Sequence, residues 1–325
     1  MREIAILDGN TLNPGDLAWD CIRAFGKVRL YSRTSLEQLH NHIGEAEIVL
    51  VNKVRLGADI LARAPRLRCI CVTATGYNNI DLEEAARRGI VVLNARGYGT
   101  HSVAQHVFAM VLHLTNQVAL HHASVIRGDW GEQPDFCYWH TPLQCLEGKV
   151  MGILGFGAIG QAVGHLAIAF GMQVLVCTRK SRDLPLGVKQ ASDFGELLAC
   201  SDVLSLHVPL TVATRGIMNR ETLQLMKKGS ILVNTARGEL VDEQDLAKAL
   251  ASGRPAYAAL DVLGQEPPKS GSPLFEVPNC VLTPHIAWAT WQARERLLQM
   301  TVSNIQDFLL GKWENNLAQA VREDP

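Results

Sequence analysis

Residues 150–170 read VMGILGFGAIGQAVGHLAIAF, an apolar strand followed by a glycine-rich turn and the start of a helix. The turn has the pattern G-x-G-x-x-G. In this setting the first glycine permits the tight turn, the second lets the backbone approach a pyrophosphate, and the third lets helix and strand pack closely. We therefore predict a dinucleotide-binding unit whose cofactor-binding residues include Gly155, Gly157, Ala158, Ile159 and Gly160.

Short apolar runs alternate with helical stretches on both sides of this segment. The first hundred residues contain EIAIL, KVRLY, EIVLVN, LRCICVT and IVVLN, and the later part contains VMGIL, VLVCT, DVLSLHV, ILVNT, AYAALDV and CVLTP. Apolar strands that alternate with helices are typical of parallel sheets covered on both faces. The sequence predicts an α/β protein with two doubly wound parallel-sheet domains.

Helical periodicity predicts how the two domains are connected. Shorter helices are expected near residues 17–24, 36–42, 59–64 and 82–88. A long helix is expected to begin at Ser102, with a capping box to Gln105, and to run past Val118. A second long helix covers 291–309. We therefore expect the chain to cross between domains twice, with residues 101–287 inserted between 1–100 and 288–325.

Composition excludes several classes of function. The 325 residues carry 31 Lys and Arg against 32 Asp and Glu, so no excess charge favours a nucleic acid or an anionic membrane as partner. No apolar run approaches the roughly 20 residues that span a bilayer, and the N-terminus lacks a signal-peptide pattern. The eight cysteines show no paired C-x-x-C spacing. We expect a cytoplasmic protein without a structural metal.

The strand after the glycine turn indicates the type of dinucleotide. An acidic residue at its end would bind the ribose hydroxyls of NAD, but this strand ends at Thr178, Arg179 and Lys180, with Arg182 close behind. An arginine at this position can bind a 2'-phosphate through its planar fork, and a lysine adds charge. We predict NADP as the preferred cofactor, with NAD possible; the alternative is that these are solvated loop cations.

Three further segments end in reactive side chains. ILVNTARGELVD contains Arg237, ALDVLGQEPP contains Asp261 and Glu266, and CVLTPHIAWAT contains His285. An arginine beyond a buried strand can bind a carboxylate and polarise a carbonyl, and a histidine backed by a carboxylate is a general acid/base pair. Each residue alone has an ordinary alternative as an ion-pair, loop or turn residue. Together, at strand ends of one nucleotide-binding unit, they indicate an active site.

These motifs together resemble the D-isomer-specific 2-hydroxyacid dehydrogenase family over essentially the whole chain. NTARG, the glutamate before Pro267 and TPHIA match the family's catalytic arginine, glutamate and histidine in order and context. TGYNNID, HSVAQHVFAM and TPHIAWAT look most like its glycerate dehydrogenase, or hydroxypyruvate and glyoxylate reductase, branch. Gln105 stands where many members carry glutamate. The resemblance implies a Rossmann cofactor domain inserted into a flavodoxin-like substrate domain.

The resemblance also implies a reaction and a set of contacts. A 2-oxo acid would be reduced by hydride transfer, with Arg237 on its carboxylate, His285 as proton donor and Glu266 behind the imidazole. Asp261 would orient the nicotinamide carboxamide. Further cofactor contacts would be Val103, His207, Pro209, Thr214, Thr235, Ala236 and Ala287, and substrate contacts would be Lys53, Thr75, Gly76, Tyr77 and Trp288.

The sequence leaves two alternative functions open and indicates an oligomeric state. A nucleotide-sensing, corepressor-like protein of the same fold could keep all three catalytic residues, and a formate or phosphite dehydrogenase could share the fold. The aromatic segment 129–142 interrupts the strand and helix alternation. In relatives such an arm packs across a homodimer, so we expect one here, with Trp139 reaching the partner's site.

Overall fold

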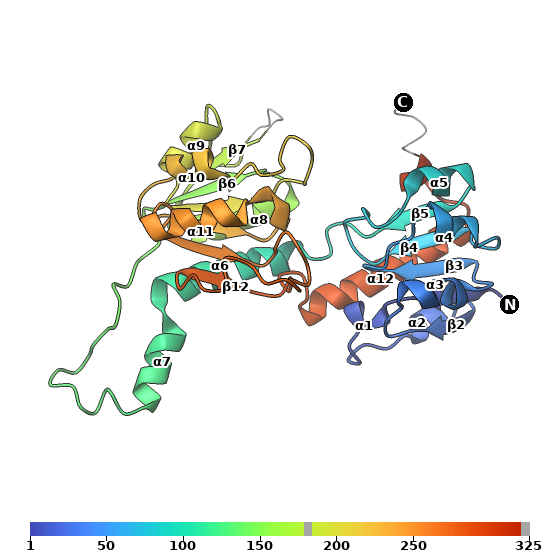
Figure 1. The fold of residues 1–325 in the computed structure, drawn as a ribbon, viewed down its shortest axis with the longest axis horizontal. Helices are drawn as coiled ribbons and strands as arrows, with labels where there is room; N and C mark the ends of the chain where they lie inside the picture. The colour runs from blue at the N-terminus through green and yellow to red at the C-terminus, as the bar shows by residue number, and fades with distance from the viewer. Residues whose placement is uncertain (179–183, 320–325) are drawn as a thin grey trace. The chain divides into compact units, whose positions relative to one another are not determined.

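The computed structural model describes residues 1–178 and 184–319 and forms two compact α/β units (Figure 1). Unit 1 comprises Met1–Gly99 with Ala289–Pro325, and unit 2 comprises Thr100–Trp288. These limits lie one residue from the expected domain boundaries. Each unit contains one parallel sheet, so the predicted fold class is confirmed. No helix in the described part of the chain is long and apolar enough to cross a membrane.

Unit 1 has a five-stranded sheet in the order β2-β1-β3-β4-β5, which is the flavodoxin-like order. Every strand pair is parallel, and β3 and β4 are buried along their whole length because helices cover both faces. The strands are β1 (Glu3–Ile6), β2 (Lys27–Leu30), β3 (Ile48–Val51), β4 (Cys69–Val72) and β5 (Val91–Asn94). The helices are α1 (Gly9–Leu12), α2 (Asp20–Arg23), α3 (Leu36–Ile43), α4 (Ala58–Ala62), α5 (Leu82–Arg87) and α12 (Trp291–Leu309).

The helix expected over 17–24 is shorter than predicted. Only Asp20–Arg23 is helical, and the unpredicted α1 precedes it. The side-chain Oδ1 of Asn13 accepts hydrogen bonds from the backbone N–H groups of Gly15 and Leu17, at 2.9 and 3.0 Å. These bonds hold the intervening chain in a turn, because an asparagine side chain competes with helical hydrogen bonding.

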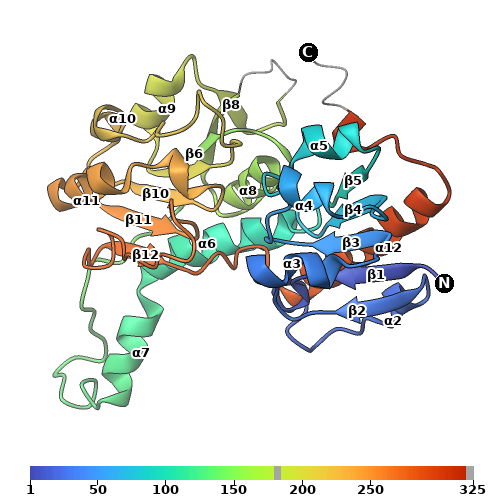
Figure 2. The ribbon, with the colours of Figure 1, turned by 45° about the vertical axis from the view of Figure 1, so that its right-hand side comes forward.

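Unit 2 has a seven-stranded parallel sheet in the order β12-β11-β10-β9-β6-β7-β8 (Figure 2). The strand order reverses between β6 and β9, which is where Rossmann-type sheets bind ligands beyond the carboxyl ends of the strands. The strands are β6 (Val150–Leu154), β7 (Gln173–Cys177), β8 (Val188–Gln190), β9 (Val203–Leu206), β10 (Ile231–Asn234), β11 (Tyr257–Leu260) and β12 (Cys280–Leu282). The sequence did not predict β8, a short edge strand that is largely exposed and has no apolar run.

The long helix of unit 2 differs from the prediction at both ends. It begins at Thr100, so the buried Ser102 lies inside the first turn and is not an N-cap. It stops at Asn116, because Gln117 adopts a left-handed φ of 50° and its side chain donates to the carbonyl of Leu114. The chain therefore forms α6 (Thr100–Asn116) and α7 (Val118–Ile126). The remaining helices are α8 (Ala158–Ala169), α9 (Phe194–Cys200), α10 (Arg220–Leu225), the short 3-10 helix η1 (Gly238–Leu240) and α11 (Glu243–Ser252).

Candidate active site

The glycine turn between β6 and α8 has the geometry that a pyrophosphate site needs. Gly155 has a φ of +91°, and a Cβ there would lie 2.6 Å from the carbonyl oxygen of His207. A Cβ on Gly160 would lie 2.3 Å from the carbonyl oxygen of Gly155, so a side chain would push the helix away from the turn. A Cβ on Gly157 would meet nothing within 4 Å, so there is open space at the N-terminus of α8. These features fit the pyrophosphate of a dinucleotide.

The residues expected to choose between NAD and NADP are only partly described. Thr178 is half-buried and directly follows β7. Arg179, Lys180 and Arg182 lie outside the described residues. The preference for NADP therefore stays a prediction.

The other predicted cofactor contacts follow the carboxyl ends of neighbouring parallel strands. One group follows β9, where the hydroxyl of Thr214 donates to the carbonyl of Pro209 at 2.7 Å and shapes that loop. In the same loop, desolvation lowers the pKa of His207 to about 4, and its Nε2 lies 2.8 Å from Oγ of Ser205. The others lie after β10, after β11, after β12 and in α6, and they are Thr235, Ala236, Asp261, Ala287 and Val103.

Arg237 lies in the loop after β10. The side chain of Asn234 donates to the Arg237 carbonyl at 2.8 Å, and Nη1 of Arg237 donates to the Ala236 carbonyl at 2.6 Å. Among the described residues, no carboxylate pairs with its guanidinium within 4 Å. A Cβ on Gly238 would lie 1.9 Å from the carbonyl carbon of Leu263. The missing side chain therefore lets this loop pack directly against the loop after β11.

Glu266 and His285, the predicted acid/base pair, lie within hydrogen-bond distance of each other. Nδ1 of His285 lies 2.6 Å from Oε2 of Glu266, with the two side chains 26% and 36% exposed. The other carboxylate oxygen of Glu266 accepts a hydrogen bond from the backbone N–H of Leu263 at 3.0 Å. In the described part of the chain, no protein group bonds Nε2 of His285. The carboxylate therefore contacts one nitrogen of the ring, and the opposite nitrogen makes no hydrogen bond to the described residues.

Asp261 supports the loop that carries His285. Its carboxylate is 1% exposed and accepts hydrogen bonds from the backbone N–H groups of Ile286 and Ala287, at 2.9 and 2.8 Å. The backbone N–H of His285 donates to the Asp261 carbonyl at 2.8 Å, and His285 has a φ of 56°. Asp261 thus lies behind the loop in this structure. Its contact with a nicotinamide carboxamide stays a prediction.

The predicted substrate-binding residues of unit 1 lie beyond β3 and β4. Lys53 is exposed, and its backbone N–H donates to the buried carboxylate of Asp8 at 2.6 Å. The hydroxyl of Thr75 donates to the Ala95 carbonyl at 3.0 Å, and Tyr77 is half-buried against the core of unit 1. Gly76 lies between them, and the half-buried Trp288 is the last residue of unit 2. Their contacts with substrate stay predictions.

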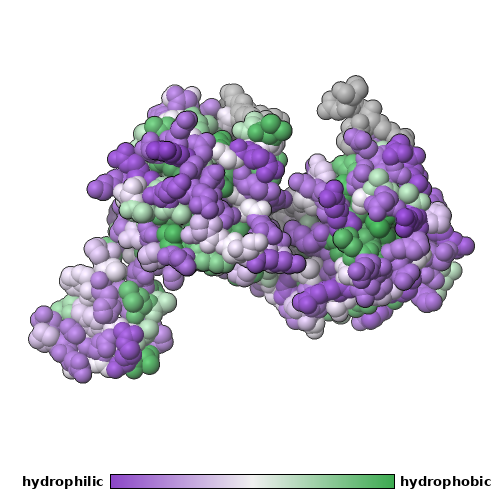
Figure 3. Space-filling model, viewed as in Figure 1, coloured by the Kyte–Doolittle hydropathy of each residue, from purple (hydrophilic) through white to green (hydrophobic). Residues whose placement is uncertain are grey.

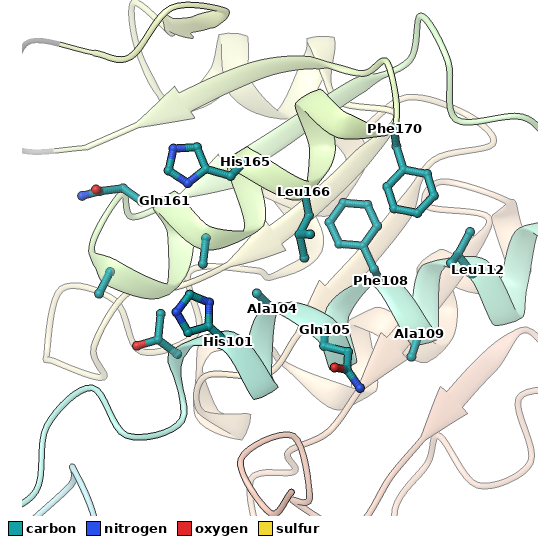
Figure 4. A pocket seen from close by; sticks show the side chains of 13 residues that line it. His101, Ala104, Gln105, Phe108, Ala109, Leu112, Gln161, His165, Leu166 and Phe170 are labelled. Carbon is teal, nitrogen blue, oxygen red and sulfur yellow. The ribbon is translucent and has the colours of Figure 1, made fainter. Parts of the chain in front are cut away.

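A groove of about 810 Å³ lies between α6 and α8, and its lining does not include Arg237, Glu266 or His285 (Figure 4). Most of its walls are apolar, and the rings of Phe108 and Phe170 stack at one end with centroids 4.9 Å apart. His101 and His165 line it as well. No group of three or more His, Cys, Asp or Glu within residues 1–178 and 184–319 is arranged to bind a metal ion.

Comparison with known proteins identifies the family. Residues 108–287 match the family model of the D-isomer specific 2-hydroxyacid dehydrogenase NAD binding domain. The chain belongs to this family. It is 44% identical over 313 residues to a hydroxypyruvate reductase of Blautia hydrogenotrophica, covering 95% of this chain and 97% of that protein. It is 39% identical to a glycerate dehydrogenase of Methylorubrum extorquens, covering 86% of this chain and 88% of that one.

Solved structures of similar proteins agree with the 2-hydroxyacid dehydrogenase fold. D-lactate dehydrogenase from Aquifex aeolicus, in complex with NAD and lactic acid, has a TM-score of 0.82 and 29% identity, covering 96% of this chain and 97% of that one. An acyclic imino acid reductase, Bsp5, in complex with NADPH and D-Arg, has a TM-score of 0.84 and 28% identity, covering 98% and 100%. The resemblance inferred from the motifs is thus confirmed. This chain is a family oxidoreductase that takes a nicotinamide cofactor and a small 2-hydroxy or 2-oxo acid.

Sequence reasoning missed two residues that shape the site. Gly238 is required by a backbone contact between loops that are distant in sequence, and no local pattern marks it. His106 lies in α6, and its Nε2 is 3.1 Å from Oγ1 of Thr283 in the loop after β12. Its partner is 177 residues away, so nothing in the flanking sequence reveals the contact.

Proposed function

We propose that this protein is an NAD(P)-dependent D-2-hydroxyacid dehydrogenase that reduces a small 2-oxo acid such as hydroxypyruvate or glyoxylate. The proposal rests mainly on the 2.6 Å contact between Nδ1 of His285 and Oε2 of Glu266. The pair comes from the loops after β11 and β12, next to the Arg237 loop after β10. The similarity to a hydroxypyruvate reductase across most of both chains supports the substrate class.

His285 serves as the general acid in the proposed reaction. A bound nicotinamide supplies the hydride. Nε2 of His285 donates a proton to the 2-oxo oxygen, and in the reverse direction the neutral ring accepts it. The Glu266 carboxylate fixes the orientation of the ring by its hydrogen bond to Nδ1, so that Nε2 is the nitrogen that exchanges a proton with the substrate.

Arg237 binds and polarises the substrate in this proposal. A guanidinium presents two parallel N–H donors that match a carboxylate, and a further N–H can stabilise charge that develops on the carbonyl oxygen. The absence of a competing carboxylate among the described residues supports this role, since the charge is not already neutralised within unit 2. The hydrogen bond from the Asn234 side chain to the Arg237 carbonyl fixes the backbone from which the Arg237 side chain extends.

A substrate panel tests the proposed function. The full chain is assayed with NADPH and NADH against hydroxypyruvate and glyoxylate, and with the oxidised cofactors against formate and phosphite. We expect turnover with the 2-oxo acids. Turnover with formate or phosphite alone would favour the second dehydrogenase type, and cofactor binding without any turnover would favour a corepressor-like role.

We expect a higher kcat/KM with NADPH than with NADH, because Arg179 and Lys180 can bind the 2'-phosphate. The double replacement Arg179→Ser with Lys180→Ser should reduce this preference about 10- to 100-fold, the range expected for lost hydrogen bonds to a charged group. Lys189→Ser in β8 is the matched control, as an exposed lysine in the same domain. A wild-type preference for NADH would refute the assignment.

We also infer a homodimer assembled through the predicted aromatic segment 129–142 and the preceding α7, and residues 118–142 together are called the arm below. The arm contains α7, stands away from the sheet of unit 2 and carries hydrophobic surface (Figure 3). The oxygen Oγ of Ser124 lies 2.6 Å from Asp129 and 2.7 Å from both Tyr138 and His140, so the arm has a defined shape of its own. Its exposed large apolar side chains are Val118, Leu120, Val125, Ile126, Trp130, Phe136 and Trp139.

Light scattering tests this assembly. We expect a mass twice that of the 35.6 kDa chain, and a lower mass for Ile126→Glu, because a charge at an apolar contact is not tolerated. Trp139→Ala should raise KM for the oxo acid if its indole reaches the partner's site. A wild-type protein of single-chain mass would contradict both inferences.

A further inference from the structure

His106 contacts the loop that carries the proposed general acid. Nε2 of this half-buried histidine lies 3.1 Å from Oγ1 of Thr283 and 3.5 Å from Oδ1 of Asp261. The Thr283 hydroxyl lies 2.5 Å from the same carboxylate oxygen. The three side chains come from α6, from the loop after β12 and from the end of β11. Among the described residues, Asp261 is the carboxylate that lies within 4 Å of this imidazole.

The direction of each hydrogen bond follows from the number of protons available. A hydroxyl has one proton to donate, and an ionised carboxylate can only accept. Thr283 therefore donates to Asp261, and the Thr283 oxygen accepts from His106. This requires that Nε2 of His106 carries its proton, whether the ring is neutral or charged. His106 is thus the first donor in a series of two hydrogen bonds, from His106 to Thr283 and from Thr283 to the buried carboxylate of Asp261.

These hydrogen bonds help to hold the backbone conformation of His285. The Asp261 carboxylate binds Thr283 before His285 and the backbone N–H groups of Ile286 and Ala287 after it. His285 itself has a φ of 56°, a left-handed conformation that is unfavourable for a residue with a Cβ and persists only when its surroundings hold it. If the Asp261 carboxylate loses a hydrogen-bond donor, its buried charge is less well compensated, and the loop around His285 is held less firmly.

We propose that His106 is a positioning residue for His285: by donating to Thr283, it orients the hydroxyl onto Asp261 and fixes the loop that presents the proposed general acid. The inference rests on the proposed function for its catalytic consequence. It adds a residue from α6 that touches neither the substrate carbon nor His285 directly. Misplacement of a catalytic group by about 1 Å can cost about 100-fold in rate.

Three variants test the role of His106 through activity. His106→Leu removes the donor, and His106→Gln keeps an N–H at a similar reach. His113→Leu, an exposed histidine in the same helix, is the matched control. We expect His106→Leu to lower kcat about 10- to 100-fold and to shift the pH profile of kcat, with little change in NADPH affinity. His106→Gln should recover most of the loss, and His113→Leu should resemble the wild type.

A measurement without turnover separates this inference from the proposed function. Amide hydrogen exchange of residues 283–290, followed by mass spectrometry in the absence of substrate, reports how firmly the loop is held. We expect faster exchange in His106→Leu than in His106→Gln or the wild type, even if no oxo acid is turned over. Unchanged exchange and an unchanged pH profile in His106→Leu would overturn the proposal, as would equal loss in the leucine and glutamine variants.

Discussion

Replacing His285 by asparagine is expected to lower kcat for oxo-acid reduction about 100- to 10,000-fold while NADPH affinity changes little. The factor is the usual contribution of a positioned general acid. Asparagine cannot protonate the carbonyl oxygen, but it tolerates the left-handed backbone better than most residues. The loop held by Asp261 therefore stays in place, and the loss reports proton transfer more than local unfolding.

The measurement combines steady-state kinetics with cofactor binding. NADPH fluorescence gives the cofactor Kd, and the pH profile of kcat shows whether the ionisation that controls the wild type has disappeared. His40→Asn, an exposed histidine of α3, is the matched control. A kcat for His285→Asn within a few-fold of the wild type would mean that another group supplies the proton.

Arg237→Gln should produce the second large effect, a fall of about 100- to 1,000-fold in kcat together with a higher KM for the oxo acid. The fall in kcat is the typical loss when a donor to a developing oxyanion is removed. The rise in KM is expected because the substrate carboxylate loses a bidentate, charge-assisted hydrogen-bond partner. Arg237→Lys should restore only part of the rate, since an ammonium lacks the planar fork.

An uncharged substrate separates the two contributions of Arg237. For a carbonyl compound of similar size without a carboxylate, Arg237→Gln should raise KM much less than it does for the oxo acid. Arg215→Gln is the matched control, because Arg215 lies in the same unit in a mostly exposed, 3.9 Å pair with Glu239. Equal effects of the two glutamine variants would remove Arg237 from the site.

The fold and the order of the reactive residues could be predicted from local patterns. Buried parallel strands are apolar along their whole length, and eleven such runs matched strands of the two sheets within a few residues. The glycine spacing identified the turn of β6 and α8. Local patterns gave wrong helix ends where a side chain hydrogen-bonds to the backbone. Asn13 shortened one predicted helix in this way, and Gln117 divided another.

The pairing of Glu266 with His285 was expected from family motifs, but only the tertiary structure shows how the site is held. Residues that are distant in sequence meet because parallel strands end at one edge of a sheet. Leu263 comes against Gly238 in this way, and His106 reaches Thr283 and Asp261 because α6 packs against β10 and β11. Sequence patterns record which groups are available and which conformations each residue prefers. Distances, and the buried carboxylate that holds His285 in its left-handed conformation, arise only when the strands assemble.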